Sequence, residues 1–284
     1  MIAITYKNSS GKTYDLVGDK MRATSGGFHK YAWKPKTKER EFGDRLYGFT
    51  KESICYDMTL TLRGSLDERK KYLNELHESF ERDVITRTPG TIYYGDYSIE
   101  AYIISSDTGP SDDMIYWSDC KIEIYCEYPF WTKRILHHFG GVTNKIISTD
   151  GFDYPYDYLY DWSNSIVNQK LVIAGEIPAS FRMIVYGGCE NPTVSIGELT
   201  YKVNTSLLTG EYLVIDTIKK KIIKAKNNGE EVNVFNERDR EADFFEKIPA
   251  GSHFVAWSGG FRFDIELMIE RSEPEWILSM QTEI

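Results

Sequence analysis

The 284-residue chain has few cysteines, no long apolar run and no excess of positive charge. Cys55, Cys120, Cys126 and Cys189 form no CxxC motif. Cys120 and Cys126 would share one face of a strand, and we interpret them as two reduced core thiols, not as a disulfide or a metal site. No stretch approaches the roughly 18 apolar residues that a membrane-spanning helix requires. The formal net charge of −9 argues against nucleic-acid binding, which favours a basic face.

Catalytic motifs are also missing. The sequence contains no GxGxxG, Walker loop, HExxH or GxSxG pattern. His137 and His138 are adjacent, would face opposite sides of a strand, and are interpreted as linker residues. Acidic residues are abundant, so a carboxylate pair of a glycan-cleaving enzyme stays open, but no motif singles one out. We therefore expect no enzyme, no cofactor and no metal.

The start of the chain predicts where the protein is made. Met1–Lys7 has no basic region followed by an apolar run, so we expect no secretory signal and synthesis in a cytoplasm. Apolar residues make up 41% of the chain and aromatic residues 14%, which is enough for one large core or two ordinary ones. Aromatic residues suit strands, protein interfaces and sugar-binding surfaces.

The last third of the sequence has the pattern of consecutive antiparallel strands. Apolar and polar residues alternate between turn signals such as Asn227–Gly229 and Ser258–Gly260. The expected strands are Gly210–Asp216, Lys219–Lys226, Val232–Phe235, Ala250–Trp257 and Phe261–Arg271. The lysines of Lys219–Lys226 could bind phosphate, but a strand with one face exposed to solvent explains them better. Residues 169–284 are thus expected to form a β-sandwich.

One helix is expected in the first half. Ser65 can cap its start, and Asp67 and Glu68 follow in the first turn. The predicted apolar stripe, which must cover a sheet, consists of Leu73, Leu76, Phe80 and Val84. Around the helix, strands are expected at residues 1–6, 54–63, 91–105 (with a turn at 95–96) and 116–128.

The charged run Lys34–Arg45 is expected to be a loop. Trp33–Gly48, which includes Phe42, is a candidate interface loop that folds only on assembly. The first domain is therefore α+β over residues 1–135, and the whole chain is mainly β.

Residues 136–168 are expected to be an aromatic and acidic junction between the two domains. Asp150–Trp162 combines tyrosines and aspartates in the most unusual local composition of the chain. Its spacing does not match an EF-hand calcium loop, which leaves sugar stacking or packing between domains. The candidate interface residues in it are Tyr154, Tyr156, Tyr158, Tyr160 and Trp162.

The order of several motifs resembles the distal tail protein (Dit) family of bacteriophages and prophages. In the first half, the helix is followed by Pro89–Ile92, a short hairpin and a strand that ends in Cys126–Trp131 (CEYPFW). In the second half, the motifs are Tyr186–Pro192, Gly210–Thr217, Phe244–Gly251 and Arg271–Trp276.

The resemblance implies a structural role. A ring, usually a hexamer, would join the tail tube protein to the tail-associated or baseplate protein in the virion. The second domain would be a galectin-like or carbohydrate-module-like sandwich. The alternative function is carbohydrate binding to host cell-wall glycan, although the chain has no room for an inserted sugar-binding module.

Overall fold

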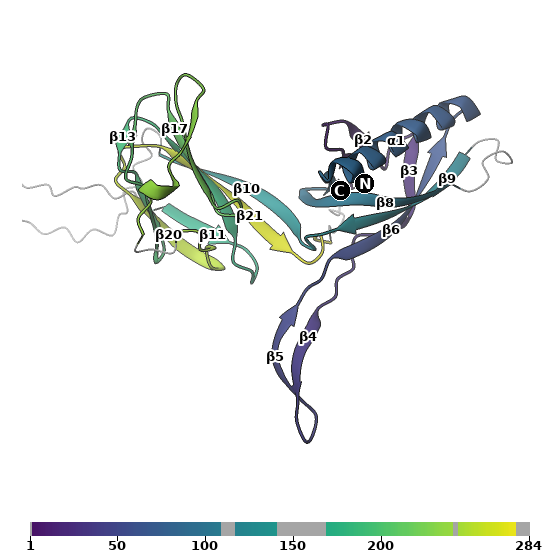
Figure 1. The fold of residues 1–284 in the computed structure, drawn as a ribbon, viewed down its shortest axis with the longest axis horizontal. Coiled ribbons are helices and arrows are strands. Elements are labelled where there is room, and N and C mark those ends of the chain that lie inside the picture. Colours follow the sequence, from purple (N-terminus) through teal and green to yellow (C-terminus); the bar gives the residue numbers. More distant parts are fainter. Residues whose placement is uncertain (1, 109–116, 141–168, 241–243, 277–284) are drawn as a thin grey trace, which may run out of the picture. The chain divides into compact units, whose positions relative to one another are not determined.

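The computed structural model describes residues 2–108, 117–140, 169–240 and 244–276. It divides the chain into two compact units (Figure 1). Unit 1 runs up to Lys133 and includes the end of the chain from Glu270, and unit 2 is Arg134–Ile269. The chain is mainly β, as the sequence predicts. No helix among the described residues is both long and apolar enough to cross a membrane.

Unit 1 is an antiparallel sheet covered by one helix, α1 (Leu66–Thr86). The strands follow the order β3–β6–β9–β8–β7–β1–β2, and the first residues of β10 also pair with β8. Their bounds are β1 (Ile4–Lys7), β2 (Thr13–Asp15), β3 (Met21–Gly26), β6 (Ile54–Arg63), β7 (Gly90–Tyr94), β8 (Tyr97–Thr108), β9 (Trp117–Cys126) and β10 (Trp131–Phe139). Strand β6 has the predicted bounds because its side chains alternate between the core and the other face.

Helix α1 begins with a capping box. The Ser65 hydroxyl accepts a hydrogen bond from the Glu68 amide, and the Glu68 carboxylate accepts one from the Ser65 amide. The helix ends at Arg87, which adopts the left-handed conformation with φ of 53°. Leu73, Leu76 and Phe80 are buried against the sheet as predicted.

Val84 was expected on the same stripe, but it is 43% exposed. Asp83 takes the buried position instead, three residues after Phe80. Its carboxylate accepts hydrogen bonds from the Tyr6 hydroxyl and from the amide and hydroxyl of Ser9. Burial and the Asp83 carboxylate raise the pKa of the Tyr6 hydroxyl well above its ordinary value. Hydrogen bonds thus allow a carboxylate to replace an apolar residue here.

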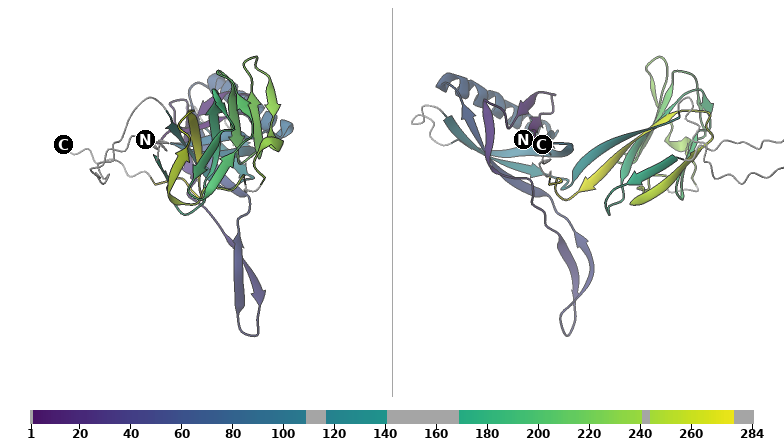
Figure 2. Two further views of the ribbon diagram at one scale, coloured as in Figure 1. Left: turned by 90° about the vertical axis from the view of Figure 1, so that its left-hand side faces the viewer. Right: turned by 180° about the vertical axis from the view of Figure 1, so that it is seen from behind.

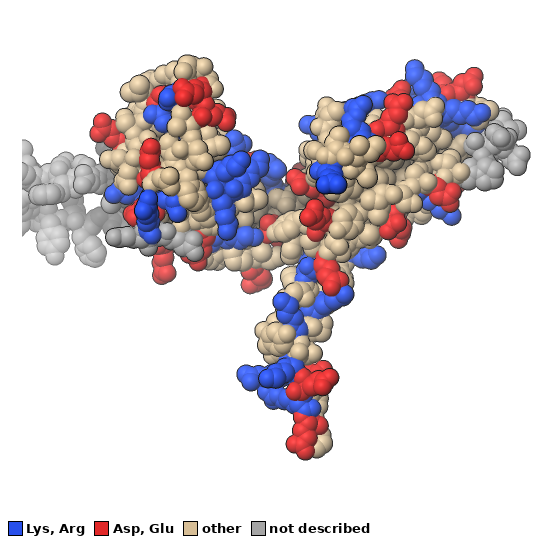
Figure 3. Space-filling view, in the orientation of Figure 1, with Lys and Arg blue, Asp and Glu red and all other residues tan. Residues whose placement is uncertain are grey.

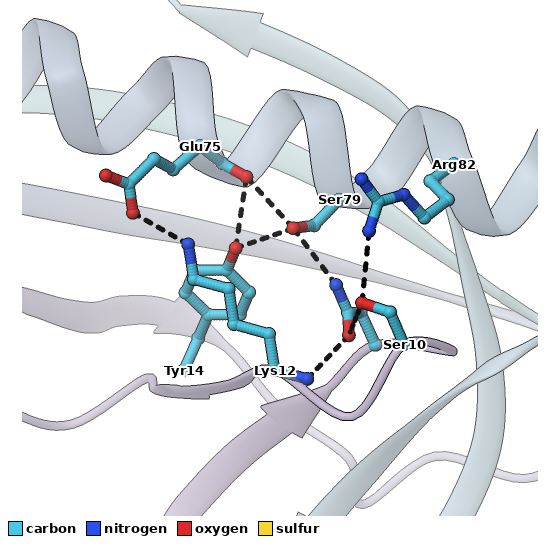
Figure 4. A network of polar contacts seen from close by, with 7 residues as sticks. Ser10, Lys12, Tyr14, Glu75, Ser79 and Arg82 are labelled. Atoms are coloured by element: carbon cyan, nitrogen blue, oxygen red, sulfur yellow. Dashed lines mark hydrogen bonds and ion pairs between the residues drawn. The ribbon is translucent and has the colours of Figure 1, made fainter.

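Side chains from the β1–β2 hairpin hold the middle of α1 (Figure 4). The Lys12 ammonium lies 2.8 Å from the Glu75 carboxylate, and the Tyr14 hydroxyl donates to the Glu75 carbonyl oxygen at 3.0 Å. The Ser79 hydroxyl contacts Tyr14 at 2.5 Å and accepts from the Asn8 amide at 3.2 Å. This network holds the helix against the β1–β2 hairpin.

Unit 2 is a sandwich of antiparallel strands around one core. One layer has the order β19–β18–β17–β12–β21–β10 and the other β11–β20–β14–β15, with a small β13–β16 pair beside them. The bounds are β11 (Gln169–Ile173), β12 (Ser180–Tyr186), β13 (Cys189–Glu190), β14 (Thr193–Ile196), β15 (Leu199–Lys202), β16 (Ser206–Leu207), β17 (Tyr212–Asp216), β18 (Lys221–Ala225), β19 (Glu231–Asn233), β20 (Gly251–Trp257) and β21 (Phe263–Arg271), with a 3₁₀ turn η2 (Phe235–Glu237).

The boundary between the units falls inside β10 and β21. Residues 136–139, which the sequence assigns to the start of a junction, continue β10 as regular strand. His138 is therefore not a linker residue, and its Nδ1 lies 2.7 Å from the Asp264 carboxylate on β21. The thiols of Cys120 and Cys126 are buried and free, and burial raises the pKa of Cys126 to about 12.

Candidate interface surfaces

Within the described part of the chain, several exposed apolar side chains lie on a two-stranded hairpin, β4 (Lys34–Glu39) and β5 (Asp44–Thr50). Phe42 at its tip is 87% exposed, and Leu46, Tyr47 and Phe49 on β5 are each more than half exposed. The hairpin pairs with no other strand of the described chain. It stands away from the sheet of unit 1 in every view (Figures 1 and 2).

The structure corrects the prediction that Lys34–Arg45 is a loop. Six residue pairs connect β4 to β5, from Lys34 opposite Thr50 to Glu39 opposite Asp44, with a bulge after Lys36. The connecting turn is closed by a hydrogen bond from the Arg40 amide to the Gly43 carbonyl oxygen, and Gly43 has φ of 68°. Phe42 lies in this turn. The segment therefore has the geometry of a two-stranded hairpin, and whether it folds only on assembly stays a prediction.

The hairpin is more basic than the rest of the chain. Residues 34–50 contain five basic side chains and three acidic ones, whereas the whole chain has a net charge of −9. Figure 3 shows lysine and arginine along the hairpin, interrupted by uncharged surface and by acidic residues towards the tip. A surface with this charge suits an acidic partner.

A residue at each end of the hairpin contacts the ring of Phe130, which lies in the connection before β10. The ring of Trp33, just before β4, lies 6.1 Å from the ring of Phe130. The ammonium of Lys51, just after β5, lies 4.0 Å from the centroid of the Phe130 ring and 5.6 Å from that of Trp33. It donates a hydrogen bond to the Pro129 carbonyl oxygen at 2.5 Å. Burial lowers the pKa of the Lys51 amine to about 8.

A second candidate surface lies on the outer face of the larger layer of unit 2. Tyr186 on β12 is paired with Tyr212 on β17, and both rings are partly exposed. The Tyr186 hydroxyl donates to the Asp264 carboxylate at 2.7 Å, and that carboxylate also contacts His138. Aromatic rings beside charged hydrogen-bonding groups are able to bind a sugar ring through stacking and hydrogen bonds.

Unit 2 also has an open hollow of about 630 Å³ between β13–β14 and the end of β20. Trp257 contributes to its wall, but this ring is buried and its Nε1 donates to the Phe261 carbonyl oxygen. The hollow therefore offers no free aromatic face from Trp257. Within the described ranges, no three or more His, Cys, Asp or Glu side chains are grouped in a way that could hold a metal ion.

The candidate interface residues from the sequence fall into two sets. Trp33 and Phe42 lie at the base and the tip of the hairpin, and both are exposed. Tyr154, Tyr156, Tyr158, Tyr160 and Trp162 lie outside the described residues. An interface role for either set stays a prediction. The candidate interface segment Trp33–Gly48 contains Leu46 and Tyr47 without singling them out, and it stops short of Phe49 and Lys51. The Phe42–Asp44 segment (FGD) contains a recognisable turn signal that would have indicated the hairpin.

Solved structures of phage tail proteins have the same fold. The SPP1 Dit protein, described as a paradigm of the hub adsorption apparatus in phages that infect Gram-positive bacteria, matches with a TM-score of 0.64 and 8% identity. The match covers 94% of this chain and 99% of that chain. Chains of the phage P2 baseplate in its activated conformation match at 12% identity, with TM-scores of 0.62 for the Ca form and 0.64 for the Sr form.

These baseplate matches cover 96% of this chain and 100% of the other chain. No protein-family model matches the sequence, and no curated protein matches it. The chain thus shares its fold, over nearly its whole length, with the SPP1 Dit and P2 baseplate proteins, which confirms at the level of fold the resemblance that the sequence motifs indicate.

Proposed function

We propose that this chain is a structural subunit of a phage or prophage tail tip. Copies of the subunit form a ring, six in number, that joins the tail tube to the baseplate or host-adsorption apparatus. The subunit is made in the cytoplasm of the bacterial host and acts in the virion. Its partners are copies of itself, the tail tube protein and the tail-associated or baseplate protein, and it catalyses no reaction.

The exposed apolar hairpin β4–β5 is the observation that carries this proposal. An isolated two-stranded hairpin is marginally stable in water, and Phe42, Tyr47 and Phe49 leave its apolar surface uncovered. Such a surface gains stability when another molecule covers it. A second copy of this acidic chain suits the basic hairpin, and a closed ring gives each hairpin one neighbour.

The mass of the full-length protein in solution, measured together with electron microscopy of negatively stained particles, tests this proposal. The expected particle is a ring with a central channel. Replacement of Phe42, Tyr47 and Phe49 by serine is expected to release folded monomers. A protein that stays monomeric at all concentrations, alone and with a tail tube protein, would contradict the proposal.

Carbohydrate binding is a second candidate function, and the Tyr186–Tyr212 pair supports it. The two rings offer apolar faces beside the Asp264 carboxylate, which is the chemistry that a glycan of the host cell wall requires. This role is compatible with the structural one, because the pair lies on unit 2 and the hairpin on unit 1. Calorimetric titration with wall polysaccharide separates the two roles.

A further inference from the structure

The hairpin β4–β5 is attached to unit 1 through a small cluster at its base. Trp33 and Lys51 stand at the two ends of the hairpin, and both contact the same ring, Phe130. Phe130 is itself held by the neighbouring Tyr128 ring at 5.2 Å, and the next residue, Trp131, is fully buried. A single residue of the body therefore contacts both ends of the hairpin.

The Lys51 amine is not paired with an acidic side chain in this cluster. The adjacent Glu52 carboxylate lies 2.6 Å from the Lys34 ammonium instead. The Tyr128 hydroxyl donates to the Glu270 carboxylate at 3.0 Å, and burial raises the pKa of that hydroxyl. The Lys51 amine contacts the rings of Trp33 and Phe130 and the Pro129 carbonyl oxygen.

We propose that Trp33, Lys51 and Phe130 form the hinge that sets the direction in which the hairpin leaves unit 1, and that the protonation state of the Lys51 amine determines how firmly this hinge is closed. The role of this hinge in assembly rests on the proposed function, in which the hairpin is the contact between copies of the subunit. A hairpin held in one direction is ready to meet its neighbour and loses less freedom on assembly.

The direction of the effect follows from the loss of water around the amine. The rings and the carbonyl oxygen attract the ammonium, but burial lowers the pKa to about 8, so the neutral amine fits the closed hinge better than the charged one. When the hinge opens, the amine returns to water and its pKa rises. The closed hinge therefore binds fewer protons between these two pKa values, and closing is increasingly favoured as the pH rises above about 8.

A distance measurement between two spin labels tests the hinge. One label is placed at the tip by Glu41→Cys and the other on α1 by Lys70→Cys, both exposed sites of unit 1, with Cys55 and Cys189 replaced by serine. The buried Cys120 and Cys126 stay unlabelled. The labelled full-length chain is diluted with unlabelled chain, so that only distances within one molecule are read.

The distance distribution is expected to be broad at pH 6.5 and narrower at pH 9.5, with the change occurring above pH 8, between the pKa values of the closed and the open hinge. Lys51→Met keeps the apolar stem without the charge, so its distribution is expected to be narrow at both values. Lys51→Arg keeps the charge and is expected to show no pH dependence. Lys38→Met, at an exposed position of β4 further along the hairpin, is the matched control and is expected to keep the wild-type pH dependence.

The same width at both pH values in the wild type, or a Lys51→Met variant that is broader than the wild type at pH 6.5, would overturn the proposal. Either result can be read from the isolated subunit, whether or not it assembles. A chain that shows the pH-dependent hinge and never forms a ring would contradict the proposed function and leave the hinge intact.

Discussion

The Tyr14 hydroxyl on β2 donates a hydrogen bond to the carbonyl oxygen of Glu75 in the middle of α1, at 3.0 Å. Residues 61 positions apart are joined by this bond, which is supported by the Lys12–Glu75 ion pair beside it. The Ser79 hydroxyl lies 2.9 Å from the same carbonyl oxygen, so polar side chains of both the helix and the β1–β2 hairpin gather at this point. The β1–β2 hairpin therefore fixes both the position and the rotation of the helix.

Loss of the Tyr6 hydroxyl is expected to destabilise unit 1. Tyr6→Phe leaves the buried Asp83 carboxylate with only its bonds to Ser9, so the free energy of unfolding should fall by about 1–3 kcal/mol. Urea denaturation followed by circular dichroism measures the change. Tyr31→Phe, at an exposed position, is the matched control and should change the free energy of unfolding by less than about 0.5 kcal/mol. Equal effects in both variants would contradict the account of Asp83.

Removal of the helix cap is expected to have a smaller effect. Ser65→Ala removes the acceptor of the Glu68 amide, so the free energy of unfolding should fall by about 1 kcal/mol. Ser65→Asp restores an acceptor and should recover most of the loss. Thermal melts of the three proteins provide the comparison, and an alanine variant as stable as the wild type would show that the cap contributes nothing.

Replacement of apolar residues on the hairpin should weaken self-association without destabilising the subunit. The triple change Phe42→Ser, Tyr47→Ser and Phe49→Ser removes rings that are exposed in the monomer, so unit 1 loses no core packing. Association between copies should weaken by roughly tenfold or more. Sedimentation velocity over a range of concentrations measures this.

Ile218→Ser is the matched control for the hairpin variant. Ile218 is an exposed apolar residue in the turn after β17 of unit 2, away from the hairpin in the chain. Its replacement should leave self-association unchanged. An identical loss of association in both variants would indicate general surface hydrophobicity, and not the hairpin, as the cause.

Sugar binding, if it occurs on unit 2, should depend on the tyrosine pair. Tyr186→Ala with Tyr212→Ala removes both exposed ring faces and should abolish any heat of binding to wall polysaccharide. The control Phe254→Ala removes an exposed ring from β20, in the other layer, and should leave binding unchanged. Binding that survives in the double variant would exclude this surface as the sugar site.

The sequence predicts the elements that have one buried face. Strand β6 and strands such as β17 and β21 of unit 2 alternate between core and solvent, and this alternation is visible in the sequence. The predicted bounds of β6 and of β17–β21 therefore come within a few residues of the structure, whereas no bounds were predicted for β11–β16. The start of α1 is equally clear, because Ser65 and Glu68 form a capping box. Asp83 was missed because its burial depends on Tyr6, a partner from another strand that no local pattern indicates.

The hairpin could not be recognised from hydrophobic periodicity. Strand β4 carries Lys34, Lys36 and Lys38, and all six of its residues are exposed, so neither face has the apolar pattern of a half-buried strand. A strand whose apolar partner is expected to be another molecule leaves little trace in its own sequence. The contact between Lys51 and Phe130 has no local sequence signal either, because Phe130 lies in a distant connection of the same chain.

The most direct test of the proposed function is the mass and image of the purified full-length chain at rising concentration, alone and with a tail tube protein. Mass photometry and electron microscopy should detect closed six-membered rings with an open centre, and the hairpin variant should reduce them to single subunits. If the unaltered chain gives only single subunits under every one of these conditions, the proposed function is contradicted.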